Sequence, residues 1–415
     1  MTATPQELYR QRLKRVTDAI RLKIPDRVPV LANFRFFAAR HAGMTCEDVF
    51  YKPRAWMAAN KKVIQEFEPD MHYGLFSASG SVFEILDLKQ LKWPGHGVPP
   101  HHSHQYVEGE YMRADEYDAF IDDPSDYIFR TLLPRIYGAL TPFTRLPPLK
   151  KFMLAAYKSV GLLKIFGDSE IQAAFKALLR AGEEAAKLSD CLAPFDEEMK
   201  QIGFPLFSKS QAITPFDWIG DFARGIRGVM LDMYRQPDNL LKAIDKMTPL
   251  IIDETVSAAQ ASGNPRVYLT LHLGADGYMS PDQFKTFYWP GLKKLLVALI
   301  EAGLTPCPLL EGEYDSRLAF FNELPRGTVL AHFENTDLFR AKKIIGDNVC
   351  LCGNVPLSLL HAGTPGEVAH YCKKLIDGVG REGGLIIAPR SVLDDARPEN
   401  IKAMIDVTKS YGVYK

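Results

Sequence analysis

The sequence predicts an α/β protein built as a single (β/α)8 barrel of the TIM type, with a long helical insertion after the second strand. Short β-branched or apolar runs alternate with longer amphipathic helical patterns along the chain. There are eight such runs, which is the number of strands in this barrel. The length of 415 residues suits one large barrel domain, or two to three average domains. An open, doubly wound sheet is the alternative architecture.

Each expected strand ends in Gly, Pro or polar residues. In chain order the strands are Val28–Leu31, Met71–Phe76, Ser210–Thr214, Val267–Leu271, Thr305–Leu310, Thr328–His332, Val349–Cys352 and Leu385–Ala388. Three later helices have clear boundary signals. Pro281–Ala302 follows a Ser-Pro start, Thr364–Val379 opens with a T-P-G-E capping pattern, and Pro398–Tyr411 stops at Gly412.

Residues 77–209 interrupt the strand and helix rhythm with Pro-rich turns followed by helical sequence. We interpret them as an insertion that caps the barrel mouth within one domain spanning residues 1–415. Inside the insertion, Arg145–Gly167 holds five Lys or Arg residues and no acid, interleaved with apolar residues. This stretch is either a docking surface for a partner or membrane, or an ordinary amphipathic helix with solvated lysines.

Composition excludes several classes of function. Fifty Lys and Arg balance fifty Asp and Glu, and the sequence pI of about 7.1 argues against a nucleic-acid binder. Apolar stretches such as Leu295–Ile300 are too short to cross a bilayer, and the first fifteen residues lack the apolar core of a secretion signal. Six sparse cysteines are typical of a reduced protein. We expect a cytoplasmic enzyme, monomeric or homodimeric, with no nucleic-acid or membrane partner.

The common cofactor fingerprints are absent. Gly95-x-Gly97 lacks the third glycine of a dinucleotide loop, and no phosphate-binding loop of the G-x-x-x-x-G-K-[ST] type exists. The run Asp70–Gly74 is similar to the D-x-H-x-x-G loop of corrinoid-binding domains, but its glycine comes one residue early. Three histidines share a Pro-rich loop, where a metal site is one interpretation and a solvated or lid-lining loop is the other: His101, His102 and His104.

Three potential metal ligands follow or end neighbouring strands in the second half of the chain. They are Glu311 after the fifth strand, His332 at the end of the sixth and Cys352 at the end of the seventh. Neighbouring strands lie about 4.8 Å apart, and barrel active sites form where strands end. Carboxylate, imidazole and thiolate groups there suit Zn²⁺. The alternative is a paired Glu311, a hydrogen-bonded core His332 and a packed Cys352.

Further polar residues follow the other strands. His272 follows the fourth strand, and Arg390 and Ser391 follow the eighth, so all three are expected at the same rim. The run Thr214–Trp218 after the third strand adds the carboxylate of Asp217 there. Its aromatic residues, Phe216 and Trp218, are either walls of the site or part of the core.

Five motifs resemble the uroporphyrinogen decarboxylase superfamily, whose members are (β/α)8 barrels, and the resemblance extends nearly end to end. The motifs are R-V-T-D-A-I-R-L-K-I-P-D-R-V-P-V (Arg15–Val30), D-M-Y-R-Q-P-D (Asp232–Asp238), G-Y-M-S-P-D-Q-F (Gly277–Phe284), C-G-N-V-P (Cys352–Pro356) and P-E-N-I-K-A-M (Pro398–Met404). In decarboxylases, a basic N-terminal motif grips propionates. The corresponding stretch here, Phe34–Gly43, is aromatic-rich and matches only in part.

The other branch of the superfamily comprises cobalamin-linked methyltransferases. Their coenzyme M members hold zinc through two cysteines and a histidine, at positions that are Leu309, Glu311 and Ser391 here. Aryl-ether demethylases use Glu and His instead, and Glu311 and His332 reproduce their spacing of Glu, twenty residues, then His. A further upstream Glu of that pattern falls on Leu296, so Cys352 is our candidate third ligand.

The resemblance therefore implies a zinc-dependent methyltransferase that moves a methyl group from a small methyl ether, expected to be a methoxylated aromatic, to the cobalt(I) of a separate corrinoid protein. Zinc on Glu311, His332 and Cys352 is expected to act as a Lewis acid on the ether oxygen. The residues expected to bind substrate are Phe34, Phe36, Phe216, Asp217, Trp218, His272 and Arg390. A decarboxylase, and a barrel without chemistry that binds a corrinoid protein, are the alternatives.

Overall fold

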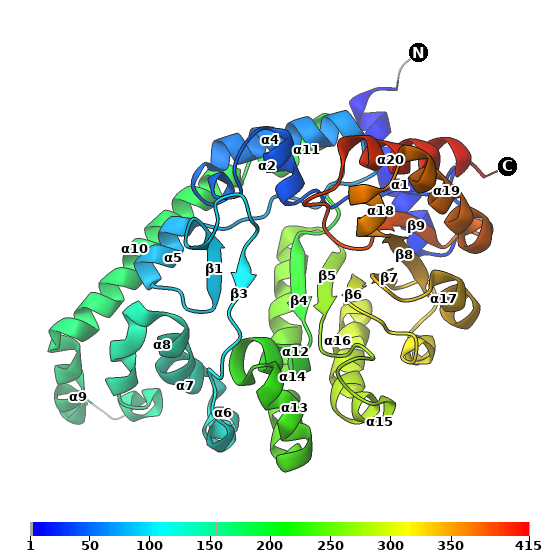
Figure 1. The fold of residues 1–415 in the computed structure, drawn as a ribbon. Helices are drawn as coiled ribbons and strands as arrows, with labels where there is room; N and C mark the ends of the chain where they lie inside the picture. Colours follow the sequence, from blue (N-terminus) through cyan, green and yellow to red (C-terminus); the bar gives the residue numbers. More distant parts are fainter. Residues whose placement is uncertain (1–2, 154–155, 415) are drawn as a thin grey trace.

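A parallel sheet of six strands forms the centre of the protein in the computed structural model, which describes residues 3–153 and 156–414 (Figure 1). The strand order follows the chain, and helical segments connect each strand to the next, as parallel pairing requires. The strands are β4 (Ser210–Ile213), β5 (Arg266–Leu271), β6 (Thr305–Leu310), β7 (Leu330–Phe333), β8 (Cys350–Val355) and β9 (Leu385–Pro389). They match the last six of the eight strands predicted from the sequence.

Short backbone contacts link the two outer strands of this sheet, β9 and β4. The segment before residue 32 lies beside β9, residues 70–72 lie beside that segment, and residues 205–207, which lead into β4, lie beside residues 70–72. The parallel bridges are Val30 to Ile387, Leu31 to Met71 and His72 to Leu206. The first two predicted strands are therefore present as single bridges only, and the arrangement is compatible with a TIM-type barrel.

Apart from β4, the strands are largely buried on both faces, as expected for a parallel sheet with helices packed against it. Every residue of β7, β8 and β9 is buried. On one face the strands contribute cysteine and aliphatic side chains to a compact cluster, which includes Cys307, Leu330, Cys350, Cys352 and Ile386. Polar residues that directly follow β5 and β6 are therefore held by a rigid, densely packed base.

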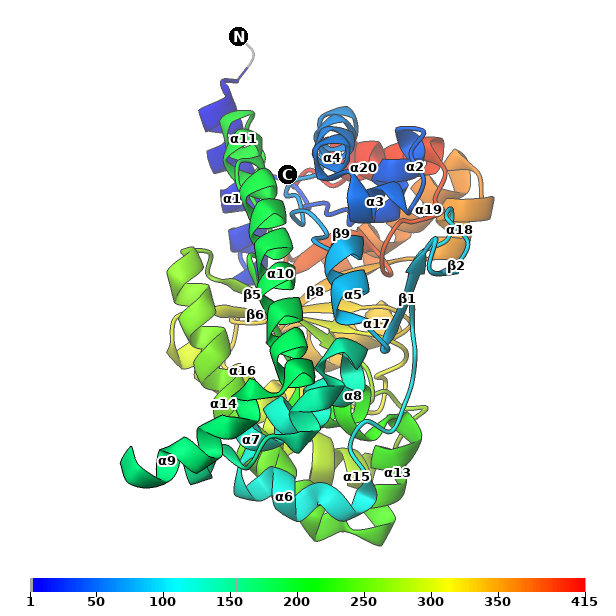
Figure 2. The same ribbon diagram turned by 90° about the vertical axis from the view of Figure 1, so that its left-hand side faces the viewer.

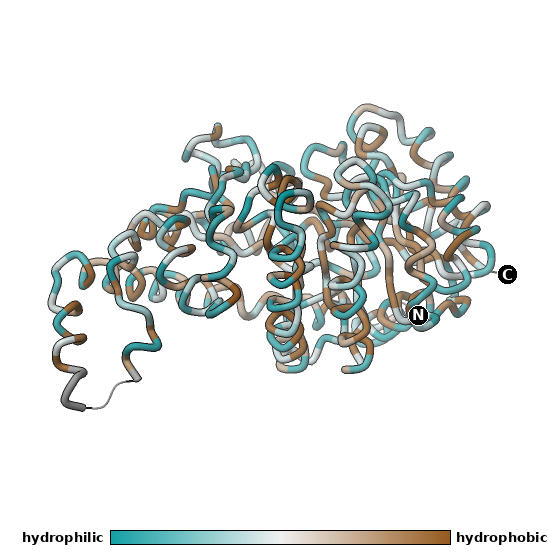
Figure 3. The backbone as a smooth tube through the Cα atoms, turned by 90° about the horizontal axis from the view of Figure 1, so that it is seen from below, coloured by the Kyte–Doolittle hydropathy of each residue, from teal (hydrophilic) through white to brown (hydrophobic). Residues whose placement is uncertain are grey.

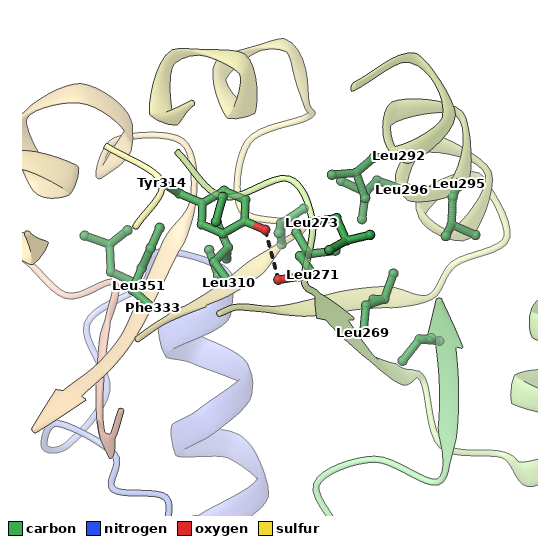
Figure 4. Close-up of a cluster of buried hydrophobic side chains, with 14 of the residues drawn as sticks. Leu269, Leu271, Leu273, Leu292, Leu295, Leu296, Leu310, Tyr314, Phe333 and Leu351 are labelled. Atoms are coloured by element: carbon green, nitrogen blue, oxygen red, sulfur yellow. Dashed lines mark hydrogen bonds between the residues drawn. The ribbon is translucent and has the colours of Figure 1, made fainter. Parts of the chain in front are cut away.

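The opposite face of the sheet packs against helices. Figure 4 shows Leu269 and Leu271 of β5 facing leucines of α16 (Trp289–Glu301), with Leu310, Phe333 and Leu351 further along the same layer. The phenol of Tyr314 donates to the backbone carbonyl of Leu271 at 2.9 Å and ties the loop after β6 to the end of β5. This hydrogen bond fixes two neighbouring strand ends relative to each other.

The helices outside residues 77–209 surround the sheet, and hydrophobic and hydrophilic residues alternate along them (Figure 3). They are α1 (Pro5–Ile20), α2 (Phe36–His41), α3 (Asp48–Tyr51), α4 (Pro53–Phe67), α12 (Pro215–Trp218), α13 (Ile226–Arg235), α14 (Pro237–Ser262), α15 (Pro281–Gln283), α16, α17 (Leu338–Ile345), α18 (Leu357–Ala362), α19 (Pro365–Leu375) and α20 (Pro398–Tyr411).

Two of the three helices predicted with clear boundaries differ from the structure. Helix α20 has the predicted bounds, and Thr364 caps α19 reciprocally with Glu367 as the T-P-G-E pattern indicates. However, α19 ends at Leu375, where the chain continues as a π-helical turn. The predicted helix Pro281–Ala302 is divided into α15, a π-helical turn and α16. Pro290 near the start of α16 has no N–H to donate, which explains a break at this point.

Residues 77–209 contain a small three-stranded sheet and seven α-helices in their described part. The elements are α5 (Gly80–Leu86), β1 (Leu91–Pro94), β2 (Gly97–Val98), β3 (Gln105–Tyr106), α6 (Tyr117–Asp122), α7 (Pro124–Tyr127), α8 (Leu133–Ile136), α9 (Ala156–Leu163), α10 (Ser169–Leu192) and α11 (Phe195–Gln201), with short 3-10 and π turns between some of them. The long helix α10 runs beside α5 (Figure 2) and contributes to a separate apolar cluster with Leu86, Leu140 and Phe143.

A buried polar network joins this segment to α13. The guanidinium of Arg224 donates to Asp232 at 2.6 Å and to the carbonyl of Met112 at 2.5 Å, and it also pairs with Glu110. Tyr117 of α6 donates to the same Asp232 at 2.8 Å. Because Arg224 and Asp232 are almost fully buried, these bonds hold the segment firmly against the helices beside the sheet.

The basic stretch Arg145–Gly167 includes α9 and lies partly outside the described residues. Arg145 pairs with Asp168 and Glu170, and Lys150 pairs with Asp122, so part of its charge is compensated within the chain. None of the helices in the described ranges has both the length and the apolar character needed to cross a bilayer.

Candidate active site

Three acidic side chains and one imidazole converge where β5 and β6 end. His272 directly follows β5, and its Nδ1 lies 2.5 Å from a carboxylate oxygen of Asp221. Its Nε2 lies 3.5 Å from a carboxylate oxygen of Glu311, which directly follows β6. The imidazole is therefore placed between two carboxylates, and we call Asp221, His272 and Glu311 the rim triad.

Asp217 positions the rim triad by binding the backbone at His272. It is fully buried at the end of Thr214–Trp218, where Thr214 caps α12. One of its oxygens accepts from the backbone N–H of Leu273 at 2.9 Å, and the other accepts from His272 N–H at 3.1 Å and from the phenol of Tyr288 at 2.6 Å. These three bonds fix the turn of the chain at the end of β5, and therefore fix the direction of the His272 side chain.

Burial and mutual charge shift the pKa values of these groups. Burial raises the pKa of Asp217 to about 6, and the nearby Asp221 adds to this. Burial also raises the pKa of Glu311. Burial alone would lower the pKa of His272, but its carboxylate neighbours raise it to about 9. Such opposed shifts in one cluster are typical of sites that hold or move protons.

A further carboxylate lies next to this cluster. Glu334 directly follows β7 and accepts from the backbone N–H of Gly312 at 2.6 Å. Its charge contributes to the raised pKa of Glu311. Sequence reasoning missed both Asp221 and Glu334. The signal for Asp221 is its spacing of four residues from Asp217, which places both on one helical face.

The predicted metal donors are arranged differently from the expectation. His332 and Cys352 are directly paired on β7 and β8, whereas Glu311 lies beyond Leu309, the residue of β6 that pairs with His332. His332 uses Nε2 to donate to the carbonyl of Pro389 at 2.8 Å, so only Nδ1 keeps a free lone pair. Cys352 is fully buried in the apolar cluster, where burial raises the pKa of its thiol well above the ordinary value.

Across residues 3–153 and 156–414, no three His, Cys, Asp or Glu side chains are gathered so that they could hold a metal ion. Glu311 faces His272, and the Cys352 thiol has an environment that disfavours the thiolate that zinc requires. In this arrangement Glu311, His332 and Cys352 do not fit a bound zinc ion. The zinc site stays a prediction from the sequence.

The aromatic residues predicted to wall the substrate pack mostly against other rings. Phe34 is stacked on Phe37, and Phe36 on Phe50. Phe216 contacts Tyr288, and Trp218 is stacked on Phe120 at 5.7 Å between ring centroids. The structure therefore places these four side chains in aromatic clusters of the core, apart from the partly exposed edge of Trp218.

The remaining predicted substrate ligand, Arg390, directly follows β9 and is half-buried at the rim. It donates to the side-chain carbonyl of Asn335 at 2.8 Å.

The three histidines of the Pro-rich loop have different environments. His101 and His102 are exposed, whereas the ring of His104 stacks on Phe76, with 5.5 Å between the ring centroids. The structure thus brings together Asp217, His272 and Glu311 from the predicted set.

The loop that is similar to a corrinoid-binding loop has a structural role. Asp70 is fully buried and accepts from Arg15 at 2.6 Å and from Arg27 at 2.8 and 2.9 Å. Both arginines belong to the motif Arg15–Val30. His72 is buried, and its Nε2 lacks a hydrogen-bond partner. The arginines of one motif therefore pair with the aspartate of the other, and these ion pairs join α1 to the sheet.

Comparisons with known proteins place these features in a wider context. Residues 210–411 match the sequence model of the family described as "Uroporphyrinogen decarboxylase (URO-D)". The uroporphyrinogen decarboxylases of Chlorobaculum parvum and Chloroherpeton thalassium are each 24% identical to this chain over 182 residues, which cover 43% of this chain and 50% of theirs. The chain thus spans about half the length of the curated relatives it matches.

A solved structure is similar over nearly the whole chain. It is a methyltransferase from Methanosarcina mazei, with a TM-score of 0.62 and 14% sequence identity, and the match covers 96% of this chain and 98% of that one. At this identity the likeness establishes a shared fold. It includes residues 77–209 in the common architecture, because so little of either chain is left unmatched.

Proposed function

We propose that this chain is a methyltransferase of the uroporphyrinogen decarboxylase superfamily, because residues 210–411 match the sequence model of the uroporphyrinogen decarboxylase family. Its reaction moves a methyl group from a small methyl ether, a methoxylated aromatic, to the cobalt(I) of a separate corrinoid protein. We take the bridges between β9 and β4 to complete an eight-stranded (β/α)8 barrel, and residues 77–209 to cap its mouth.

The rim triad is the observation that carries this proposal. An ether is inert because its alkoxide or phenoxide leaves poorly, so the leaving oxygen needs a proton or a positive charge as the carbon–oxygen bond breaks. In the rim triad both imidazole nitrogens of His272 face carboxylates, an arrangement that keeps both nitrogens protonated. The contact from Nε2 to Glu311 is the longer one, so this N–H is the donor available to a substrate oxygen.

The likeness to a methyltransferase structure over nearly the whole chain also supports this assignment. We assign the acid role to His272 and the orienting role to Asp221 and Asp217, which hold the ring and the backbone of His272. The methyl group is transferred to a nucleophile that enters from the open mouth, and the proton of Nε2 goes to the leaving oxygen. The assignment to His272 does not depend on a metal ion.

Decarboxylation is the second candidate, because the curated relatives are named uroporphyrinogen decarboxylases. The acidic composition of the rim argues against it. A substrate with many carboxylates requires a strongly basic cleft, whereas Asp221, Glu311 and Glu334 lie together at this mouth.

Product analysis separates the two candidates. The chain is incubated with a panel of methoxylated aromatics and a reduced corrinoid protein, and separately with uroporphyrinogen under anaerobic conditions. We expect release of the demethylated phenol, only when corrinoid is present, and no carbon dioxide from the porphyrinogen. Carbon dioxide release, or phenol release at full rate without corrinoid, contradicts the proposal.

A further inference from the structure

Two neighbouring loops carry His272 and Glu311 of the rim triad. The His272 loop, residues 272–280, joins β5 to α15, and the Glu311 loop, residues 311–317, follows β6. Because β5 and β6 are paired along their whole length, both loops leave the sheet at the same edge. Neither loop contains a helix or a strand, so the spacing of the two side chains depends on the contacts that the loops make.

One arginine, Arg317, reaches from the Glu311 loop to the His272 loop. It is fully buried although it carries a charge. Its guanidinium donates to the carbonyl of Gly274 at 3.4 Å and to the carbonyl of Met279, and it pairs with the carboxylate of Asp276 at 3.3 Å. It also lies over the ring of Phe284, 4.8 Å from the centroid. A single side chain of one loop thus binds three points of the other.

Asp276 and Ser316 complete this connection. The Ser316 hydroxyl donates to Oδ1 of Asp276 at 2.7 Å, and the Ser316 backbone N–H donates to Oδ2 at 3.1 Å. The same hydroxyl accepts from Arg317 at 2.7 Å. The backbone N–H of Asp276 in turn donates to the carbonyl of Glu313 at 2.7 Å. We call Asp276, Ser316 and Arg317 the loop clasp.

The two loops also approach each other closely at their beginnings. Gly312 has a φ of +88°, and a Cβ at this position would lie 3.2 Å from the Cβ of Ala275. The phenol of Tyr314 donates to the carbonyl of Leu271, the residue before His272 (Figure 4). The loops are therefore in contact from the strand ends to the loop clasp.

The buried guanidinium does more than fill space. Taking a charge out of water is costly, and apolar side chains can fill such a position at a lower cost. In return, directed bonds to several fixed acceptors define one course of the His272 loop. Asp217 holds the first two residues of this loop through their backbone N–H groups, and the loop clasp holds residues 274–279. The backbone that carries His272 is thus fixed from both sides.

We propose that Arg317 is a positioning residue, which keeps His272 at the distance from Glu311 that leaves Nε2 accessible to a substrate oxygen. This inference rests on the proposed function, to which it adds a residue outside the rim triad. The 3.5 Å between Nε2 and Glu311 is too long for a strong hydrogen bond, so these two side chains do not hold each other. A displacement of about 1 Å can slow a positioned reaction about 10²-fold.

Kinetics of Arg317→Lys test this role. Lysine keeps the charge but lacks the planar fork that reaches several acceptors at once. We expect kcat for methyl transfer to fall about tenfold or more, and KM for the methyl donor to stay within about twofold, because the acid is displaced while the binding surface is kept. Ser316→Ala removes one hydroxyl of the loop clasp and leaves the buried charge paired. It should lower kcat in the same direction by a smaller factor.

Arg266→Lys is the matched control. Arg266 is also buried and also donates to backbone carbonyls, including that of Leu206 at 2.9 Å, but it begins β5, at the opposite end of the strand from His272. Both lysine variants should lower Tm, since each disturbs a buried guanidinium. Only Arg317→Lys should lower kcat, which a merely structural role of Arg317 would not produce.

A spectroscopic measurement separates the positioning role from the reaction. In protein with isotope-labelled histidine, the Nδ1 proton of His272 that faces Asp221 should give a far-downfield NMR signal, identified by its absence in His272→Gln. No substrate or corrinoid is needed. Arg317→Lys should shift or broaden this signal, and Ser316→Ala should do so to a smaller extent. Arg266→Lys should leave it unchanged.

The outcomes distinguish this inference from the proposed function. The positioning role is overturned if the His272 signal or kcat of Arg317→Lys matches the wild type, or if Arg266→Lys changes both to the same extent. Should Arg317→Lys fail to fold, unchanged signal and kcat in Ser316→Ala overturn it instead. If the signal changes as described but the wild-type chain transfers no methyl group to cobalt, the proposed function fails while the positioning role stands.

Discussion

His272 and Asp221 are joined by a contact of 2.5 Å between imidazole Nδ1 and carboxylate Oδ2, although the two residues lie 51 positions apart in the chain. Asp221 belongs to the turn after α12, and His272 to the end of β5. The contact therefore exists only because β4 and β5 are adjacent in the sheet. It leaves Nε2 as the nitrogen that faces Glu311, at 3.5 Å.

Replacing either partner should slow methyl transfer with little loss of stability. For Asp221→Asn and His272→Gln we expect a decrease in kcat of about 10²–10³-fold, the usual effect of removing a general acid or its orienting group. The rate of phenol release measures this. His370→Gln is the matched control, because His370 is exposed on α19. Rates of the Asp221 and His272 variants within threefold of wild type would remove the acid role from His272.

The network between α13 and residues 77–209 should make a large contribution to stability. Asp232→Asn leaves the buried guanidinium of Arg224 without its main counter-charge, which typically costs about 3–5 kcal/mol. Urea denaturation measures the change. Arg235→Ala on the same helix, where the side chain is exposed, should stay within about 0.5 kcal/mol of wild type. Similar changes in the free energy of unfolding for both variants would show that the network contributes little to stability.

The stability of the chain should fall in mildly acidic solution because of His72. Burial lowers the pKa of His72 to about 4, whereas the unfolded chain binds this proton below about pH 6.5. The unfolded state therefore binds more protons than the folded state between about pH 4 and 6.5. The folded state is most stable with respect to His72 above about pH 6.5, and it loses stability as the pH falls toward 4. The loss attributable to His72 amounts to about 3 kcal/mol.

Urea titrations at several pH values check this dependence. His72→Gln removes the titrating group, so the variant should show a shallower decrease in stability between pH 6.5 and 4 than the wild type. An identical slope for the two proteins would mean that His72 is not held neutral by the fold.

Metal analysis tests the zinc prediction directly. As the structure arranges Glu311, His332 and Cys352, we expect purified protein to contain well below one zinc per chain, and activity to survive a strong chelator. Close to one zinc per chain, lost in Glu311→Ala and His332→Ala, would show that these residues gather around a metal and that the resemblance to the demethylases predicted the ligands correctly.

The sequence predicted the last six strands well because most of them, such as β7, β8 and β9, are continuous runs with both faces buried. The first two runs were predicted as strands but form only bridges. The backbone N–H of Val30 donates to the side chain of Asp70 at 2.8 Å, which removes it from the ladder. The second run leaves the sheet before Gly74, where φ is +76°.

The rim was predicted in part. His272, Glu311 and Asp217 follow strands, so topology alone brings them to one edge of the sheet. Asp221 could not be identified in this way, because it lies inside a helical segment and acts only through its contact with His272. The aromatic residues were misleading for a physical reason: a phenylalanine such as Phe34 or Phe216 has the same sequence pattern in a core as in a pocket wall.

The most direct test of the central claim is a single-turnover measurement of the corrinoid itself. The chain is mixed anaerobically with 4-methoxybenzoate and a cobalt(I) corrinoid protein, and the absorbance change from cobalt(I) to methylcobalt(III) is followed. The account predicts one methylcobalt formed for each phenol released, at a rate that His272→Gln lowers about 10²-fold or more. Methylcobalt formation at an unchanged rate in His272→Gln, or no methylcobalt from any methoxylated aromatic, would contradict it.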